Sequence, residues 1–131
     1  MNEEPIFILG AHKSGTTLLR SIFDGHPALF VIPFESHFFQ NLCYWIDYDY
    51  RKEQPRTLTD QEIINRFRER LRHLNETEDK LGDTPESFEI DLPRFMRTFG
   101  QFSTSMTQKE QFELFAESVH QSLLRRTAAQ E

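Results

Sequence analysis

The sequence predicts an α/β protein with short parallel β-strands at its N-terminus and a mostly helical remainder. Three observations lead to this class. Two short apolar runs, residues 5–9 and 29–32, flank a segment whose apolar residues recur at helical spacing. A glycine-containing stretch joins the first run to that segment. Two later segments, beginning at Thr59 and Thr107, open with capping-box patterns that are typical of helix starts.

The N-terminal residues follow a strand–helix–strand order. Residues 5–9 are apolar and unbroken, as a buried strand is, and Gly10 ends them. The next segment predicts a helix that Gly25 and Pro27 end. Residues 29–32 give the second strand. Because such a unit crosses over with a right-handed turn, the two strands are expected to be parallel. The apolar face of the helix comprises Leu18, Leu19, Ile22 and Phe23.

The rest of the chain predicts helices joined by polar connections. Residues 36–48 are rich in aromatic side chains and are expected to be helical. The helix that begins at Thr59 is followed by a charged connection over residues 75–85 and a short helix over 92–102. The expected apolar face of the helix from Thr59 comprises Ile63, Ile64, Phe67, Leu71 and Leu74. That of the helix from Thr107 comprises Phe112, Phe115, Val119, Leu123 and Leu124.

Composition excludes several classes of function. A chain of 131 residues, 37% of them hydrophobic, has the length of one domain. Its net charge is −6 and no basic face is visible, so no nucleic-acid partner is expected. Cys43 is the single cysteine, and no metal site is expected. The sequence shows no signal peptide and no transmembrane segment, and a cytoplasmic location is expected.

Residues 10–20, GAHKSGTTLLR, have the features of a phosphate-binding loop. A strand that turns through glycines into a helix points several backbone N–H groups at one place, at the positive end of the helix dipole. Nucleotide triphosphatases place a lysine after the second glycine, where it reaches further phosphates. Here Lys13 precedes Gly15, so the loop suits one phosphate whose far side carries a transferring group. The alternative is that Gly10 and Gly15 are ordinary turn glycines.

PIFILGAHKSGTTLLRSIFDGHP, residues 5–27, followed by FESHFF, residues 34–39, resembles the sulfotransferases that use 3′-phosphoadenylyl sulfate (PAPS). The likeness is to the bacterial-type and tyrosylprotein-like branch. It implies a sulfotransferase fold of the P-loop nucleotide triphosphatase type, with PAPS as co-substrate and no metal. Many family members have proline where this chain has His12.

The resemblance also implies roles for individual residues. Lys13 would lie against the bridging oxygen of the donor and stabilise charge as the sulfonate leaves. Glu35 would be the base that takes the proton of the acceptor hydroxyl. His37 is the alternative base, since an imidazole titrates near neutral pH. The donor-binding residues would be Gly10, His12, Lys13, Ser14, Gly15, Thr16 and Thr17.

The family needs a second phosphate site, for the donor's 3′-phosphate, built from an arginine after a later strand and a serine further on. The nearest pattern is Arg94 with Ser103 or Ser105, but no apolar strand precedes it, so we interpret this spacing as accidental. We therefore expect residues 1–131 to be a single partial sulfotransferase domain. It would contain a phosphosulfate-binding βαβ unit over residues 5–35 and a helical region over 36–131.

The expected acceptor is a hydroxyl or amine of a small molecule or peptide. A missing C-terminal half or a homo-oligomer would complete the domain, because two parallel strands alone leave both sheet edges open. Two alternatives stay open. One is a non-catalytic remnant or interaction module that keeps the loop as a structural turn. The other is a P-loop kinase-like nucleotide-binding protein, although the sequence has no Gly-Lys-[Ser/Thr] after the loop.

Overall fold

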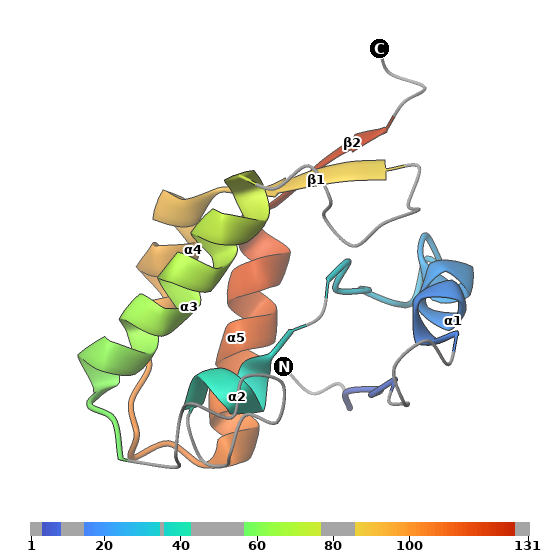
Figure 1. The fold of residues 1–131 in the computed structure, drawn as a ribbon. Helices are drawn as coiled ribbons and strands as arrows, with labels where there is room; N and C mark the ends of the chain where they lie inside the picture. Colours follow the sequence, from blue (N-terminus) through green and yellow to red (C-terminus); the bar gives the residue numbers. More distant parts are fainter. Residues whose placement is uncertain (1–3, 9–14, 35, 43–56, 77–85, 128–131) are drawn as a thin grey trace.

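The computed structural model describes residues 4–8, 15–34, 36–42, 57–76 and 86–127. Its elements in chain order are α1 (Thr16–Phe23), α2 (Phe38–Leu42), α3 (Asp60–Glu76), β1 (Glu86–Ile90), α4 (Leu92–Phe99), α5 (Gln108–Ser122) and β2 (Leu123–Thr127). In Figure 1, α3, α4 and α5 form one helical body, with β1 and β2 at its upper end and α1 to one side. The expected mostly helical composition is confirmed for these residues.

The expected parallel strands are not confirmed. Residues 4–8 and 29–32 adopt neither helix nor strand. The sheet seen among the described residues is instead antiparallel and two-stranded, with β1 paired to β2 so that Ile90 lies opposite Leu123. Parallel strands are usually found in larger sheets that are covered on both faces. The described part of the chain offers residues 29–32 no further parallel strand, which accounts for the difference.

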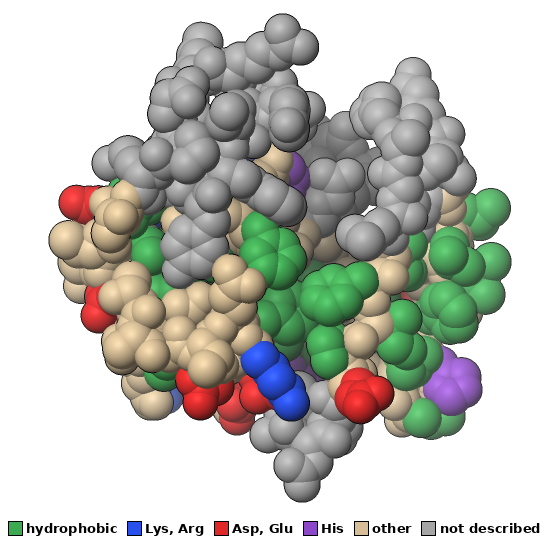
Figure 2. Space-filling view, turned by 90° about the horizontal axis from the view of Figure 1, so that it is seen from below, with side chains coloured by type: hydrophobic (Ala, Val, Ile, Leu, Met, Phe, Trp, Pro, Cys, Tyr) green, Lys and Arg blue, Asp and Glu red, His purple; other side chains and the backbone are tan. Residues whose placement is uncertain are grey.

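The apolar side chains of the N-terminal region are largely exposed. Leu18 and Ile22 on α1 are 69% and 68% exposed, and Ile6 is 74% exposed. Figure 2 shows hydrophobic side chains over the middle of one face and toward the side where α1 lies. This region therefore contributes little to the buried core.

Two ring contacts join the N-terminal region to α5. The ring of Phe7 lies 5.0 Å from that of Phe112, and the ring of Phe30 lies 4.4 Å from that of His120. The first centroid distance lies within the favourable range for aromatic pairs, about 4.5–7 Å, and the second lies at the lower edge of that range. They fix the two apolar runs against one helix of the body.

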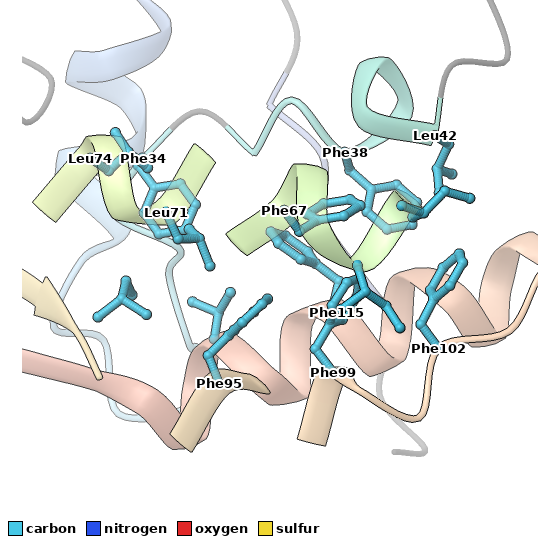
Figure 3. Packing of buried hydrophobic residues seen from close by; sticks show 14 of the residues in the cluster. Phe34, Phe38, Leu42, Phe67, Leu71, Leu74, Phe95, Phe99, Phe102 and Phe115 are labelled. Carbon is cyan, nitrogen blue, oxygen red and sulfur yellow. The ribbon is translucent and has the colours of Figure 1, made fainter. Parts of the chain in front are cut away.

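Aromatic side chains form the core of the helical body. The ring of Phe115 is fully buried on α5 and lies 5.5 Å from Phe38 of α2 and 5.3 Å from Phe67 of α3. It lies 6.4 Å and 6.3 Å from Phe95 and Phe99 of α4. Figure 3 shows these rings meeting between the helices. One residue thus contacts three other helices at once.

The start of α5 is the capping box that the sequence predicts. The Thr107 hydroxyl accepts the Glu110 N–H at 3.2 Å, and the Glu110 carboxylate accepts the Thr107 N–H at 2.8 Å. The other end of this helix differs from the prediction, because Leu123 and Leu124 belong to β2 rather than to the helix. In β2 these two residues pair with β1, and Leu124 lies opposite Glu89.

The start and the buried face of α3 are also as predicted. The Thr59 hydroxyl accepts the Glu62 N–H at 3.2 Å. The buried residues are those of the predicted face, namely Ile63, Ile64, Phe67, Leu71 and Leu74. At the far end, the Asn75 side chain donates to the Ile90 carbonyl and accepts the Ile90 N–H, both at 2.8 Å. This pair of hydrogen bonds attaches β1 to α3.

The helix expected over residues 36–48 begins two residues later than predicted. It is seen as α2, Phe38–Leu42, and residues 43–48 lie outside the described part of the chain. The Arg66 guanidinium of α3 donates to the carbonyls of Asn41 at 3.0 Å and Gln40 at 3.3 Å. A cation at the last carbonyls of a helix is favourable, so Arg66 fixes the end of α2.

Candidate functional site

The predicted loop lies only partly within the described residues. Gly10, His12, Lys13 and Ser14 lie outside them, as does Glu35. Gly15 is described, and Thr16 and Thr17 are described as the first residues of α1. The geometry of the candidate site is therefore built from the second half of the loop and from the residues that flank Glu35.

Gly15 has the backbone conformation that the loop requires. Its φ is 88° and its ψ is 13°, in the left-handed region, and it is the N-cap residue of α1. A Cβ atom at this position would have no atom within 4 Å. The glycine is therefore needed for its torsion angle rather than for space.

The start of α1 can hold an anion. The Leu19 N–H donates to the Gly15 carbonyl at 3.0 Å, and the amides of Thr16, Thr17 and Leu18 precede this bond. The first amides of a helix have no acceptor within it, and the helix dipole makes this end positive. The first turn of α1 contains no acidic residue. These are the conditions under which a helix start binds a phosphate.

The His26-Pro27 pair lies in the turn that follows α1 and has a structural explanation. Gly25 has a φ of 83° just after the helix. The His26 ring nitrogen Nδ1 accepts the Ala28 N–H at 3.1 Å, and the His26 carbonyl accepts the Leu29 N–H at 3.0 Å. This turn sends the chain from α1 back toward the helical body.

The residues around Glu35 are anchored on both sides. Phe34 is buried and stacks on Phe88 of β1, with ring centroids 5.7 Å apart. On the other side, the Ser36 hydroxyl accepts the Phe38 N–H at 3.4 Å at the start of α2. The residues on either side of Glu35 in the sequence are thus held by a core ring and by a helix start.

His37, the alternative base, has an unusual backbone. Its φ of 46° makes it the one non-glycine residue with positive φ in the described part of the chain. Its carbonyl accepts the Asn41 N–H at 3.0 Å, so the strained residue also opens α2. Such conformations are found at functional sites more often than elsewhere. The only sequence signal for this feature is that histidine tolerates positive φ better than most residues.

Arg94 and the two serines lie toward opposite ends of α4. Arg94 lies in the first turn of α4, whereas Ser103 and Ser105 follow the end of that helix. The hydroxyls of Ser103 and Ser105 lie 2.8 Å apart and bond to each other. Arg94 lies five residues before the end of α4, about 8 Å along the helix axis, and the serines follow beyond that end.

The family model that matches this sequence is described as the sulfotransferase family, and it matches residues 5–131. The chain belongs to the sulfotransferase family. The match extends through α3, α4 and α5, well beyond residues 5–39 on which the sequence resemblance rests. No curated protein and no solved structure gives a significant match.

Family membership identifies the chain as a transferase. Within the described residues, no three histidine, cysteine, aspartate or glutamate side chains of this sulfotransferase-family chain gather as they would around a metal ion. None of its described helices is both long enough and apolar enough to cross a membrane.

Proposed function

We propose that the chain takes part in sulfonate transfer from PAPS to a hydroxyl or amine of a small molecule or peptide. The observation that carries the proposal is the Lys13-Ser-Gly-Thr-Thr sequence, with Gly15 in the left-handed conformation at the start of α1. In a sulfotransferase-family chain, this loop fits the 5′-phosphosulfate of the donor. The sequence pattern resembles that of the bacterial-type and tyrosylprotein-like branch of the family.

The proposed reaction is a direct in-line displacement at sulfur. The acceptor oxygen or nitrogen forms a bond to sulfur while the bond from sulfur to the bridging oxygen breaks. The acceptor proton goes to Glu35 or His37, and adenosine 3′,5′-bisphosphate leaves. The amides at the start of α1 hold the 5′-phosphate throughout, and Lys13 neutralises the charge that grows on the bridging oxygen. The displacement itself needs no metal.

The domain organisation belongs to the same proposal. Residues 5–35 would be the phosphosulfate-binding unit of a P-loop-type fold, and residues 36–131 the mostly helical region. Two features support it: the helix start that follows Gly15, and the turn at residues 24–29 that reverses the chain direction. The 3′-phosphate site is not provided by Arg94, so donor affinity is expected to be weak.

Calorimetric titration with adenosine 3′,5′-bisphosphate and, separately, with ATP and magnesium tests the proposal. We expect the bisphosphate to bind more tightly, because the loop lacks the lysine that follows the second glycine in nucleotide triphosphatases. Tighter binding of ATP with magnesium would favour the kinase-like alternative and overturn the proposal.

One observation favours a second candidate, a non-catalytic interaction module. The apolar side chains of α1 and of residues 6–7 remain largely exposed, as they would on a surface that binds another protein. Such a module would bind neither nucleotide in the same titrations. Binding of the bisphosphate would count against it.

Two glycine substitutions separate the role of the loop from that of the fold. Gly15→Ala and Gly25→Ala both force an L-residue to a φ above 80°, and neither new Cβ meets an atom within 4 Å. Each is expected to lower the free energy of unfolding by roughly 1–2 kcal/mol. Only Gly15→Ala should also weaken binding of the bisphosphate, by about tenfold, since binding must restore the strained conformation. Equal loss of affinity in the Gly25→Ala control would contradict this assignment.

A further inference from the structure

Two buried hydrogen-bond donors on α2 and α3 have no acceptor among the described residues. They are Nδ2 of Asn41 on α2 and Nε of Arg70 on α3. A buried donor without an acceptor is costly, and more so when it is charged, so nearly all such groups in native proteins have a partner. Arg70 as a whole is only partly buried, so a bound group can reach its guanidinium. A negatively charged group would satisfy both donors.

The acidic residues of α3 nearest to Arg70 bond to a different arginine. Arg72 donates to Glu69 at 2.9 Å and to Glu76 at 2.7 Å. All three of these side chains are about half exposed, so the pairs lie on the outer side of the helix. Within the described part of the chain, neither of these carboxylates is therefore the missing partner of Arg70.

The chain that leads into α2 runs antiparallel to α3. Figure 3 shows the ring of Phe34 beside Leu71, toward the C-terminal end of α3. Further along the chain, the ring of Phe38 lies 5.8 Å from that of Phe67, which is one turn earlier on α3. The residues between Phe34 and Phe38 therefore lie along the turn of α3 that these two α3 residues bound.

Arg70 belongs to that turn and lies on the side of α3 that faces α2. Arg66, four residues earlier and so on the same side, donates to the Asn41 carbonyl at 3.0 Å. His37, one of the two proposed bases, belongs to the stretch of chain along this turn. The two unpaired donors thus lie at the contact between α2 and α3 that also holds a residue of the candidate site.

We propose that Arg70 and Asn41 bind an anionic group of the acceptor beside His37, and that the acceptor is a small molecule with a carboxylate near its hydroxyl or amine. This inference rests on the proposed sulfonate transfer. A guanidinium can donate to both oxygens of a carboxylate, which would orient the acceptor, and the Asn41 amide adds a neutral donor. A carboxylate held here would bring the nucleophile close to the base that takes its proton.

Calorimetric titration of the 131-residue chain with para-hydroxybenzoate and with para-hydroxybenzamide tests the proposal without turnover. The two probes share a ring and a hydroxyl and differ in charge. We expect the benzoate to bind about tenfold more tightly, as one charge-assisted hydrogen bond would give. Arg70→Met should abolish this preference. The matched control, Arg68→Met, removes the same charge at an exposed position of α3 and should retain it.

The phosphates of the donor are the other source of an anion, so adenosine 3′,5′-bisphosphate is titrated in parallel. Arg70→Met should leave its affinity unchanged. A tenfold loss would assign Arg70 to the donor and overturn the acceptor subsite. Equal affinity of the parent chain for the two benzoyl probes would overturn it as well, and binding of the bisphosphate would then leave the proposed function standing. A benzoate preference without bisphosphate binding would support the anion site and contradict sulfonate transfer.

Thermal unfolding followed by circular dichroism gives a second test, which does not depend on the choice of probe. If Arg70 has no acceptor within the chain, Arg70→Met removes a buried, unpaired charge, so the melting temperature should stay the same or rise. A melting temperature well below that of the Arg68→Met control would show that the guanidinium is bonded within the chain itself. That result would overturn the proposal.

Discussion

Lys13→Ala, made in a catalytically active form of the enzyme, is expected to lower turnover by about a hundredfold or more, roughly 3 kcal/mol. The proposed role of Lys13 is to neutralise charge that develops on the bridging oxygen only as the sulfonate leaves. A group that acts in the transition state affects the rate more than it affects binding of the ground state. Binding of adenosine 3′,5′-bisphosphate, measured by calorimetry, should therefore change much less than turnover.

Thr16→Ala is the matched comparison for Lys13→Ala. In the proposed site its hydroxyl contacts the same phosphate before and after transfer, so its loss should weaken binding more than it slows the chemical step. If Lys13→Ala left turnover within about threefold of the parent enzyme, roughly 0.7 kcal/mol, the catalytic role of Lys13 would be wrong. The loop would then be an anion-binding site alone.

Phe115→Ala is expected to lower the free energy of unfolding by roughly 3–5 kcal/mol. The ring is fully buried and contacts rings from α2, α3 and α4, so its removal leaves a cavity that no single helix can close. Urea denaturation followed by circular dichroism measures the change. A loss of this size is a large part of the stability of a small domain, about 5–15 kcal/mol.

Leu124→Ala provides the control for the core substitution. Leu124 lies on β2 and is 43% exposed, so its truncation should cost less than about 1 kcal/mol. If Phe115→Ala cost no more than this control, the aromatic cluster would not be the centre of the core.

Helices with strong local signals were predictable from the sequence. The capping boxes at Thr59 and Thr107 mark the starts of α3 and α5, because a hydroxyl and a backbone amide three residues on meet within one helical turn. The buried face of α3 also follows from spacing alone, since residues three and four apart share one side of a helix. These features need no information from distant parts of the chain.

The strands were harder to predict because their pairing is not local. Phe88 and Ile90 of β1 are buried, and Glu89 between them is not. This alternation is the signal of a strand, but the acidic residues of the segment obscured it. Conversely, the apolar run at residues 29–32 has strand-like composition but forms no strand in the structure. Composition predicts that a run can be a strand, and only a neighbouring strand makes it one.

The candidate site was predictable only in part. The loop pattern predicts a glycine at the start of a helix, and Gly15 has a left-handed φ of 88° there, a value that glycine adopts readily. Nothing in the local sequence predicts the positive φ of His37, which lies between buried Phe34 and the first residues of α2.

The most direct test of the central claim is hydrogen exchange with and without adenosine 3′,5′-bisphosphate. If the loop holds the donor's 5′-phosphate, the ligand should slow exchange at the amides of residues 15–18, which begin α1. The amides of α5, far along the chain and buried in the helical body, serve as the internal control. The account predicts protection at the start of α1 with no change in α5. Protection elsewhere without any at residues 15–18 would contradict it.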